Sequence, residues 1–139
     1  MNRVRTNPEA SASTTRWLEQ LAISLALPDV AGFLQTQTLR VRGVECRFLA
    51  QPSNADALSI LLDAGPLHWP RDADLLACVS ARNFDNFLMG APQFLRNPQS
   101  QRLVIAQNLV CTRTRPQAFA PILESLALQA LAWQHKERP

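Results

Sequence analysis

The sequence predicts an α+β domain in which helices pack on a twisted antiparallel sheet, in the order α-β-β-β-α-β-β-α. Apolar residues recur at helical spacing in three separate segments and alternate with polar residues in the segments between them. The chain has 139 residues, 47% hydrophobic and 18% charged, which is ordinary for one globular domain. We therefore expect a folded domain over residues 14–135, a flexible N-terminal tail over 1–13 and a C-terminal tail over 136–139.

The first helix is expected to begin at Thr14 or Thr15, whose hydroxyl is available as an N-cap. Trp17, Leu18 and Leu21 then fall on one face at helical spacing. The helix ends before Pro28, because proline disfavours helical geometry in the residue that precedes it. Its apolar face suits the core of the domain, and it also suits a surface that accepts the apolar side chains of a partner.

Three strands are expected next. Leu39 and Val41 alternate with arginines, and Arg42 and Gly43 suit a tight turn because glycine accepts positive φ. The same alternation continues to Phe48, so the hairpin has one polar face. The third strand is expected over 57–63, between loops over 51–56 and 64–70.

The middle helix is expected to begin at Asp72, a good N-cap, and to end at Gly90. Its apolar residues form several columns and leave only a narrow polar edge, whereas packing on a sheet requires one stripe. The surplus apolar surface predicts burial under a loop or in an oligomer. Ala77 and Ala81 are small enough for the close approach of a symmetry mate across a two-fold interface.

Two further strands and a helix complete the chain. The strands are expected over 93–95 and 102–110, with a turn over 97–100. The last helix carries a line of apolar residues that ends at Trp133, and Pro121 must lie in its first turn or kink it. We expect the helices to lie on one side of the five strands.

The sequence contains no pattern for catalysis, metal or cofactor. The four glycines are isolated, so there is no phosphate-binding loop, and no serine lies in a nucleophile elbow. His68 and His135 lack metal-ligand spacing, and nothing positions either of them beside Cys111 as a dyad. Cys46, Cys78 and Cys111 are odd in number and far apart, so we expect buried free thiols. We expect no cofactor and no enzyme activity.

Charge leaves one alternative function open. The net charge is +3, and Arg40, Arg42 and Arg47 can form a basic strand face, as in an adaptor or regulator that binds nucleic acid. No aromatic residues are interleaved with these arginines, so stacking platforms for bases are missing and nucleic acid is not the favoured partner. The apolar runs are too short for a membrane span, and the N-terminus lacks the apolar core of a secretory signal. We expect a cytoplasmic protein with no membrane partner.

Five short phrases occur in order along the chain: Leu39-Arg-Val-Arg-Gly-Val-Glu-Cys, Leu75-Leu76 through Asn83, Gly90-Ala-Pro-Gln-Phe-Leu, Arg102-Leu-Val-Ile-Ala and Ala132-Trp133. With the order of elements and the length, they resemble the class I type III secretion chaperones of Gram-negative bacteria, the family of the Tir and Yop effector chaperones. The resemblance spans residues 14–135. The chain departs from this typically acidic family in its sequence pI of about 9.2.

The resemblance implies a non-enzymatic bacterial cytoplasmic protein that binds the N-terminal segment of a cognate secreted effector. It implies that the chaperone keeps this segment non-globular and soluble and presents it for secretion, while the segment fills apolar grooves and adds strands to sheet edges. A homodimer built on the middle helix and the strand after it is also implied. The implied effector-binding residues are Trp17, Leu18, Leu21, Phe94, Leu103 and Ile105. The implied dimer face comprises Leu76, Ala77, Ser80, Ala81, Phe84 and Phe87.

Overall fold

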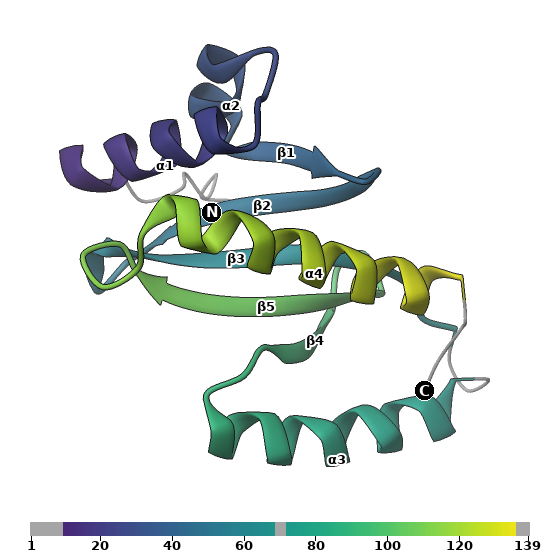
Figure 1. Ribbon diagram of the computed structural model, residues 1–139. Coiled ribbons are helices and arrows are strands. Elements are labelled where there is room, and N and C mark those ends of the chain that lie inside the picture. Colours follow the sequence, from purple (N-terminus) through teal and green to yellow (C-terminus); the bar gives the residue numbers. More distant parts are fainter. Residues whose placement is uncertain (1–9, 69–71, 136–139) are drawn as a thin grey trace, which may run out of the picture.

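A five-stranded antiparallel sheet with the order β1-β2-β3-β5-β4 forms the centre of the computed structural model, which describes residues 10–68 and 72–135 (Figure 1). The predicted fold class is confirmed, and one short helix, α2, lies in a segment expected to be a connector. In chain order the elements are α1 (Ala12–Ser24), α2 (Val30–Thr36), β1 (Thr38–Val41), β2 (Val44–Gln51), β3 (Asn54–Pro66), α3 (Ala73–Met89), β4 (Gln93–Asn97), β5 (Arg102–Val110) and α4 (Pro116–Gln134).

The β1–β2 hairpin forms as predicted. Arg42 and Gly43 both have positive φ, at 51° and 80°, which is the backbone of a two-residue turn whose twist matches the flanking strands. The register pairs Val41 with Val44 across the turn. Along β2 the side chains alternate between buried and exposed, so the predicted separation into an apolar face and a polar face is confirmed.

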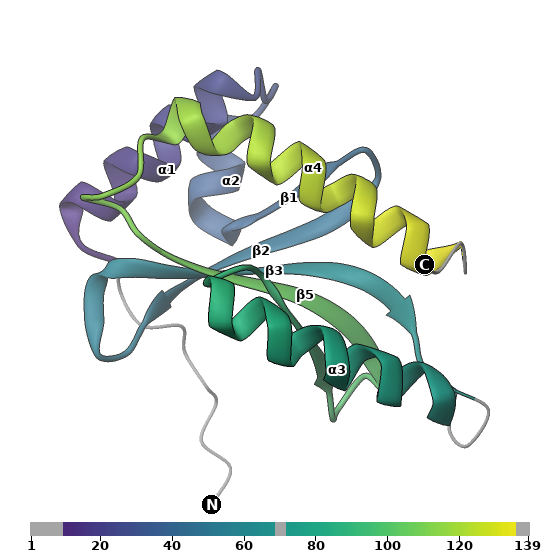
Figure 2. The same ribbon diagram turned by 60° about the horizontal axis from the view of Figure 1, so that its bottom comes forward.

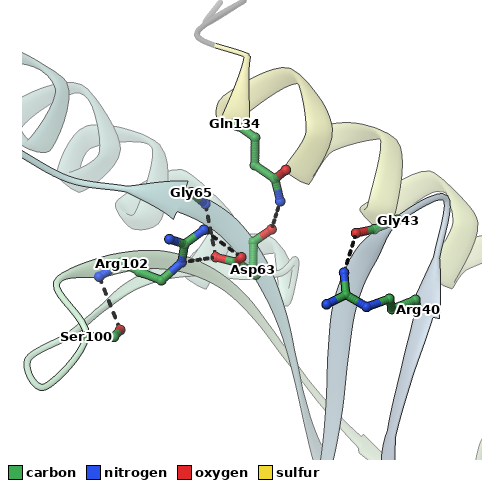
Figure 3. Close-up of polar contacts among 7 residues, drawn as sticks. All are labelled: Arg40, Gly43, Asp63, Gly65, Ser100, Arg102 and Gln134. Atoms are coloured by element: carbon green, nitrogen blue, oxygen red, sulfur yellow. Dashed lines mark hydrogen bonds and ion pairs between the residues drawn. The ribbon is translucent and has the colours of Figure 1, made fainter.

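Strand β3 is longer than predicted at both ends. The loop expected over 51–56 is only a two-residue turn, since Gln51 already pairs with Asn54. At the other end the register shifts after Asp63 and pairing resumes at Pro66. The Asp63 carboxylate accepts the Gly65 N–H at 3.1 Å, and Gly65 has φ +102°, a conformation that glycine adopts without strain (Figure 3). The strand therefore continues through a bulge instead of ending in a loop.

Three elements meet at this bulge. Arg102 of β5 donates to both carboxylate oxygens of Asp63, at 2.9 Å from Nε and 2.8 Å from Nη2. Gln134, at the end of α4, donates to the Asp63 main-chain carbonyl at 2.6 Å (Figure 3). A bidentate pair of this kind fixes orientation as well as distance. Asp63 thereby joins β3, β5 and α4.

The core lies between one face of the sheet and helices α1, α2 and α4. Trp17 of α1 packs against Phe119 of α4 with ring centroids 5.7 Å apart and the rings tilted, and its indole N–H donates to the Thr114 carbonyl at 2.7 Å. Phe33 of α2 meets Phe48 of β2 at 5.5 Å. Aromatic contacts thus join each of these helices to its neighbours around one apolar cluster.

Helix α3 lies apart from the other helices, beside the edge strand β4 (Figures 1 and 2). The expectation that all helices lie on one side is therefore wrong. The N-cap residue of α3 is Asp72, as predicted, but its carboxylate accepts the His68 N–H at 2.6 Å and does not cap the helix. Gly90 ends the helix with φ +66°, as expected for a glycine C-cap.

Two helix starts differ from the predictions. Helix α1 begins at Ala12, because Ser11 is the N-cap and accepts the Thr14 N–H at 3.1 Å. Helix α4 begins at Pro116, so Pro121 lies in its second turn and not its first. Residues 1–9 and 136–139 of the predicted tails, and residues 69–71 of the loop expected over 64–70, are outside the described ranges. Within the described ranges no helix is both long and apolar enough to cross a membrane.

Candidate partner-binding surfaces

An apolar face of α3 is exposed. Phe84 and Phe87 are 67% and 71% exposed, and Val79 is the one buried residue of this helix. The structure brings the predicted dimer face together on this side: Ala77, Ser80, Ala81, Phe84 and Phe87 are exposed and Leu76 is half-buried. Leu88 and Met89 extend the exposed apolar surface, and Leu95 of β4 is also exposed. Monomers rarely expose contiguous large apolar surface without a partner to cover it.

The side chain of Asn83 attaches α3 to the sheet. Its amide donates to the Phe94 carbonyl and accepts the Phe94 N–H, both at 2.7 Å. Asn86 adds a bond to the Pro92 carbonyl at 2.8 Å. This attachment of α3 through Asn83 was not predicted from the sequence. The available signal was an amide in the middle of an apolar helix, since such a group must find hydrogen-bond partners when it is packed inward.

Figure 2 shows the C-terminal end of α3 leaning over the outer face of the sheet. A hollow of about 590 Å³ lies between them. Phe87 and Gly90 line it from α3, and Leu61 and Ala106 line it from β3 and β5. This hollow is continuous with the exposed apolar face of α3 through Phe87.

The six predicted effector-binding side chains lie in the core. Their exposed fractions are Trp17 4%, Leu18 1%, Leu21 0%, Phe94 4%, Leu103 2% and Ile105 0%. The same apolar periodicity that suggested a partner surface instead packs these residues between the helices and the sheet. A partner that leaves the core intact contacts their exposed neighbours, such as Ile23 at the end of α1.

The edge strand β1 has an open backbone position at Arg40. Val41 and Val44 flank the two-residue turn and form a hydrogen-bonded pair, so the next pair, Arg40 and Glu45, has main-chain groups that point away from the partner strand. A hollow of about 400 Å³ lies beside this edge. Its apolar lining comes from Leu27, Pro28, Phe33 and Leu39. An exposed edge beside an apolar hollow is what an added peptide strand requires.

The predicted basic strand face is not uniformly positive. Arg40 donates to the Gly43 carbonyl at 3.1 Å, and Arg42 lies 3.9 Å from the Glu124 carboxylate. Arg47 lines a small hollow together with Glu45 and Asp63. Carboxylates therefore lie among these arginines, which does not favour the binding of a nucleic acid.

Burial shifts two of the three thiols away from the reactive thiolate form. It raises the pKa of Cys46 to about 12, and it also raises the pKa of Cys111, against a hydrogen bond from Thr14 that lowers it. A catalytic thiol requires the opposite shift. Cys78 on α3 is exposed, so the expectation that all three thiols are buried is wrong at this position. Among residues 10–68 and 72–135, no group of three metal-binding side chains comes together.

No protein-family model and no curated protein matches this sequence. Solved structures do match its fold. A chain of the ExsC–ExsE complex is 14% identical with a TM-score of 0.69, over 92% of this chain and 96% of that one. The Yersinia pestis type III secretion chaperone SycH, in complex with a stable fragment of YscM2, is 16% identical with a TM-score of 0.65, over 86% and 98%. A chain of the HopA1–SchA chaperone–effector complex is 14% identical with a TM-score of 0.60, over 93% of this chain and 97% of that one. The chain thus has the fold of type III secretion chaperones.

Proposed function

We propose that this chain is a type III secretion chaperone. It binds the N-terminal segment of a cognate effector, keeps that segment non-globular and soluble, and presents it for secretion without catalysing a reaction. The observation that carries the proposal is the match over nearly the whole length of this chain and of its neighbours, two of which are chaperones in complexes with partner proteins. The exposed apolar surface and the open sheet edge supply what such binding needs.

We propose further that two copies pair through α3. The helix leaves most of the dimer face (Leu76, Ala77, Ser80, Ala81, Phe84 and Phe87) exposed, and Leu76 is half-buried. A symmetric pair buries the same face on both copies, which is the commonest way in which soluble proteins associate. The hollow beside Phe87 widens the area available for this contact.

The effector segment is proposed to bind on the helix-covered side and at the β1 edge. Main-chain groups of Arg40 are available to a new strand, and the neighbouring hollow accepts an apolar side chain of that strand. Trp17, Leu18, Leu21, Phe94, Leu103 and Ile105 support this surface from inside the core. Main-chain pairing gives affinity that depends little on sequence, and the hollow adds selectivity.

A nuclease-treated native pull-down with the tagged chain tests the function. The eluted complex is digested with a protease and its protected fragments are identified by mass spectrometry, while light scattering gives its mass. We expect one dominant protein partner, protected along its N-terminal segment, on a dimer of this chain. Loss of the partner after nuclease treatment, or a protected segment that is a folded domain, would contradict the proposal. The first of these outcomes would favour the alternative of a nucleic-acid adaptor.

A further inference from the structure

Three segments meet at one end of the sheet: the start of α1, the turn between β2 and β3, and the loop from β5 to α4 (Figures 1 and 2). Ser11 donates to the Asp56 carboxylate at 2.6 Å, and the Cys111 N–H donates to the Asp56 carbonyl at 2.9 Å. The bond from Trp17 to the Thr114 carbonyl ties the loop to α1. These contacts fix a preformed surface, which we call the α1–α4 junction.

Two hollows lie side by side in the α1–α4 junction, and both are lined by Arg113 and Thr114. The first has a volume of about 620 Å³. Its apolar lining is Ala57, Leu109, Val110, Phe119 and Ile122. The second has a volume of about 360 Å³ and is lined by Arg16 and Arg115 as well as Arg113. The first hollow therefore combines an apolar part with polar residues such as Gln51 and Gln107, and its neighbour carries three arginines.

The arginines of the second hollow have no ion-pair partner among residues 10–68 and 72–135. All three, Arg16, Arg113 and Arg115, are exposed. No carboxylate of the described part of the chain lines either hollow. Asp56 accepts hydrogen bonds from Ser11 and from Ser13, which lines the second hollow, and these bonds lower the pKa of Asp56 and keep it ionised.

Helix α4 adds to this field. It begins at Pro116, directly after Arg115, and has no acidic residue in its first turn, so the positive end of the helix dipole adds to the three arginines. On the outer sheet face, by contrast, Arg102 is paired with Asp63. The basic strand face also has carboxylates among its arginines, since Arg42 lies 3.9 Å from the Glu124 carboxylate and Arg47 lines a small hollow with Glu45 and Asp63.

We propose that the α1–α4 junction docks an acidic stretch of the bound polypeptide. An apolar side chain enters the hollow over Phe119 and Ile122, and neighbouring carboxylates face Arg16, Arg113 and Arg115. Side chains two residues apart in an extended chain point to the same side, so alternate residues of one segment can reach both hollows. The inference rests on the proposed chaperone function and specifies the chemistry of the segment that the chaperone accepts.

Selection from random twelve-residue peptides displayed on phage tests this inference. The wild-type chain is the target, and Arg113→Glu/Arg115→Glu is used in counter-selection. We expect the selected peptides to carry aspartate or glutamate beside an apolar residue. Synthetic forms with asparagine and glutamine in place of the acids should bind about tenfold more weakly in fluorescence anisotropy, since each exposed ion pair contributes modestly.

Matched variants separate charge from fold. Arg113→Lys/Arg115→Lys should retain most of the preference for acidic peptides, and Arg47→Glu/Arg96→Glu, with the same change in net charge elsewhere, should retain it as well. A peptide whose acids are replaced by lysine should prefer Arg113→Glu/Arg115→Glu. Circular dichroism confirms that each variant is folded.

The outcomes distinguish the two proposals. Selection of apolar peptides with no enrichment of acids would overturn the docking of an acidic stretch and leave the chaperone function standing. The docking of an acidic stretch would also be overturned if Arg47→Glu/Arg96→Glu lost as much affinity for the acidic peptides as Arg113→Glu/Arg115→Glu does. Recovery of no peptide would count against both proposals. Tighter binding of a twenty-nucleotide single-stranded RNA than of the acidic peptides, lost in Arg113→Glu/Arg115→Glu, would assign the arginines to nucleic acid.

Discussion

Asn83 of α3 and Phe94 of β4 exchange two hydrogen bonds, each 2.7 Å long, between one side-chain amide and both main-chain groups of the strand residue. The amide thus occupies the place that a further β-strand would take. This pairing protects the edge of β4 at Phe94 and sets the position of α3.

Asn83→Ala should destabilise the fold by about 2 kcal/mol, because it leaves a main-chain donor and acceptor of β4 without partners. Asn83→Asp should cost more at neutral pH, since a carboxylate accepts the Phe94 N–H but repels the Phe94 carbonyl. Urea unfolding followed by circular dichroism measures both. Asn86→Ala, which removes the single bond to Pro92, is the graded control, and an equal loss in all three variants would contradict a specific role for Asn83.

Ala81→Glu should convert the proposed dimer into monomers, because it places a charge in the middle of the dimer face, where it would be desolvated. Light scattering should fall from about twice the 15.5 kDa chain mass to that mass. Leu128→Glu is the matched control, since Leu128 is a 51% exposed apolar residue on α4. A wild-type chain that is monomeric at micromolar concentration would refute the pairing.

Asp63→Asn should remove a stability contribution that depends on pH. Partial burial alone would raise the pKa of Asp63, but the hydrogen bonds from Arg102 and Gly65 and the charges of Arg102 and Arg40 lower it below 3.8. The contribution is therefore present above the unfolded pKa and is lost as pH falls through the lower folded pKa. The Arg102 side chain is 42% exposed, so solvent weakens the pair and we expect about 1 kcal/mol at pH 7.

The check is urea unfolding of the wild type and Asp63→Asn from pH 7 to pH 2.5. The two curves of stability against pH should converge below the ordinary carboxyl pKa of 3.8. Glu19→Gln, at an exposed position on α1, controls for the loss of one negative charge. A difference of constant size across the range would show that the charge of Asp63 is not responsible.

One thiol per chain should react rapidly with a maleimide at pH 8, and it should be Cys78. A pKa of about 12 leaves only about one Cys46 in ten thousand as thiolate at that pH, and burial excludes the reagent as well. All three cysteines should react in guanidinium. Mass spectrometry counts the maleimide labels on the folded wild type and on folded Cys78→Ser. Rapid labelling of Cys78→Ser would contradict the burial of Cys46 and Cys111.

Local patterns in the sequence predicted much of the fold. The Arg42–Gly43 turn and the bounds of β5 follow from residue preferences that act over a few positions. The surplus apolar surface of α3 was also predictable, because a helix on a sheet needs only one stripe. The length of β3 was not predictable from local patterns. Its bulge at Asp63 is held by Arg102 and Gln134, which are distant in sequence.

The binding surfaces were harder to predict. Periodicity placed Trp17 and Ile105 on apolar faces but does not distinguish a face that meets the core from one that meets a partner. The basic hollow was missed because Arg16 and the Arg113–Arg115 pair converge only in the folded chain. Asn83 has a role only when its strand partner is known.

The attachment of α3 through a single edge strand has a consequence for cellular abundance. The helix packs chiefly on β4, so in an isolated copy its amide protons should exchange faster than those of β3, which lies between two strands. Pairing of two copies would suppress this local opening, and by mass action the melting temperature should rise with protein concentration. Chains at low concentration would then be the most exposed to proteolysis, so a well-supplied pool of this chain would be the one to persist.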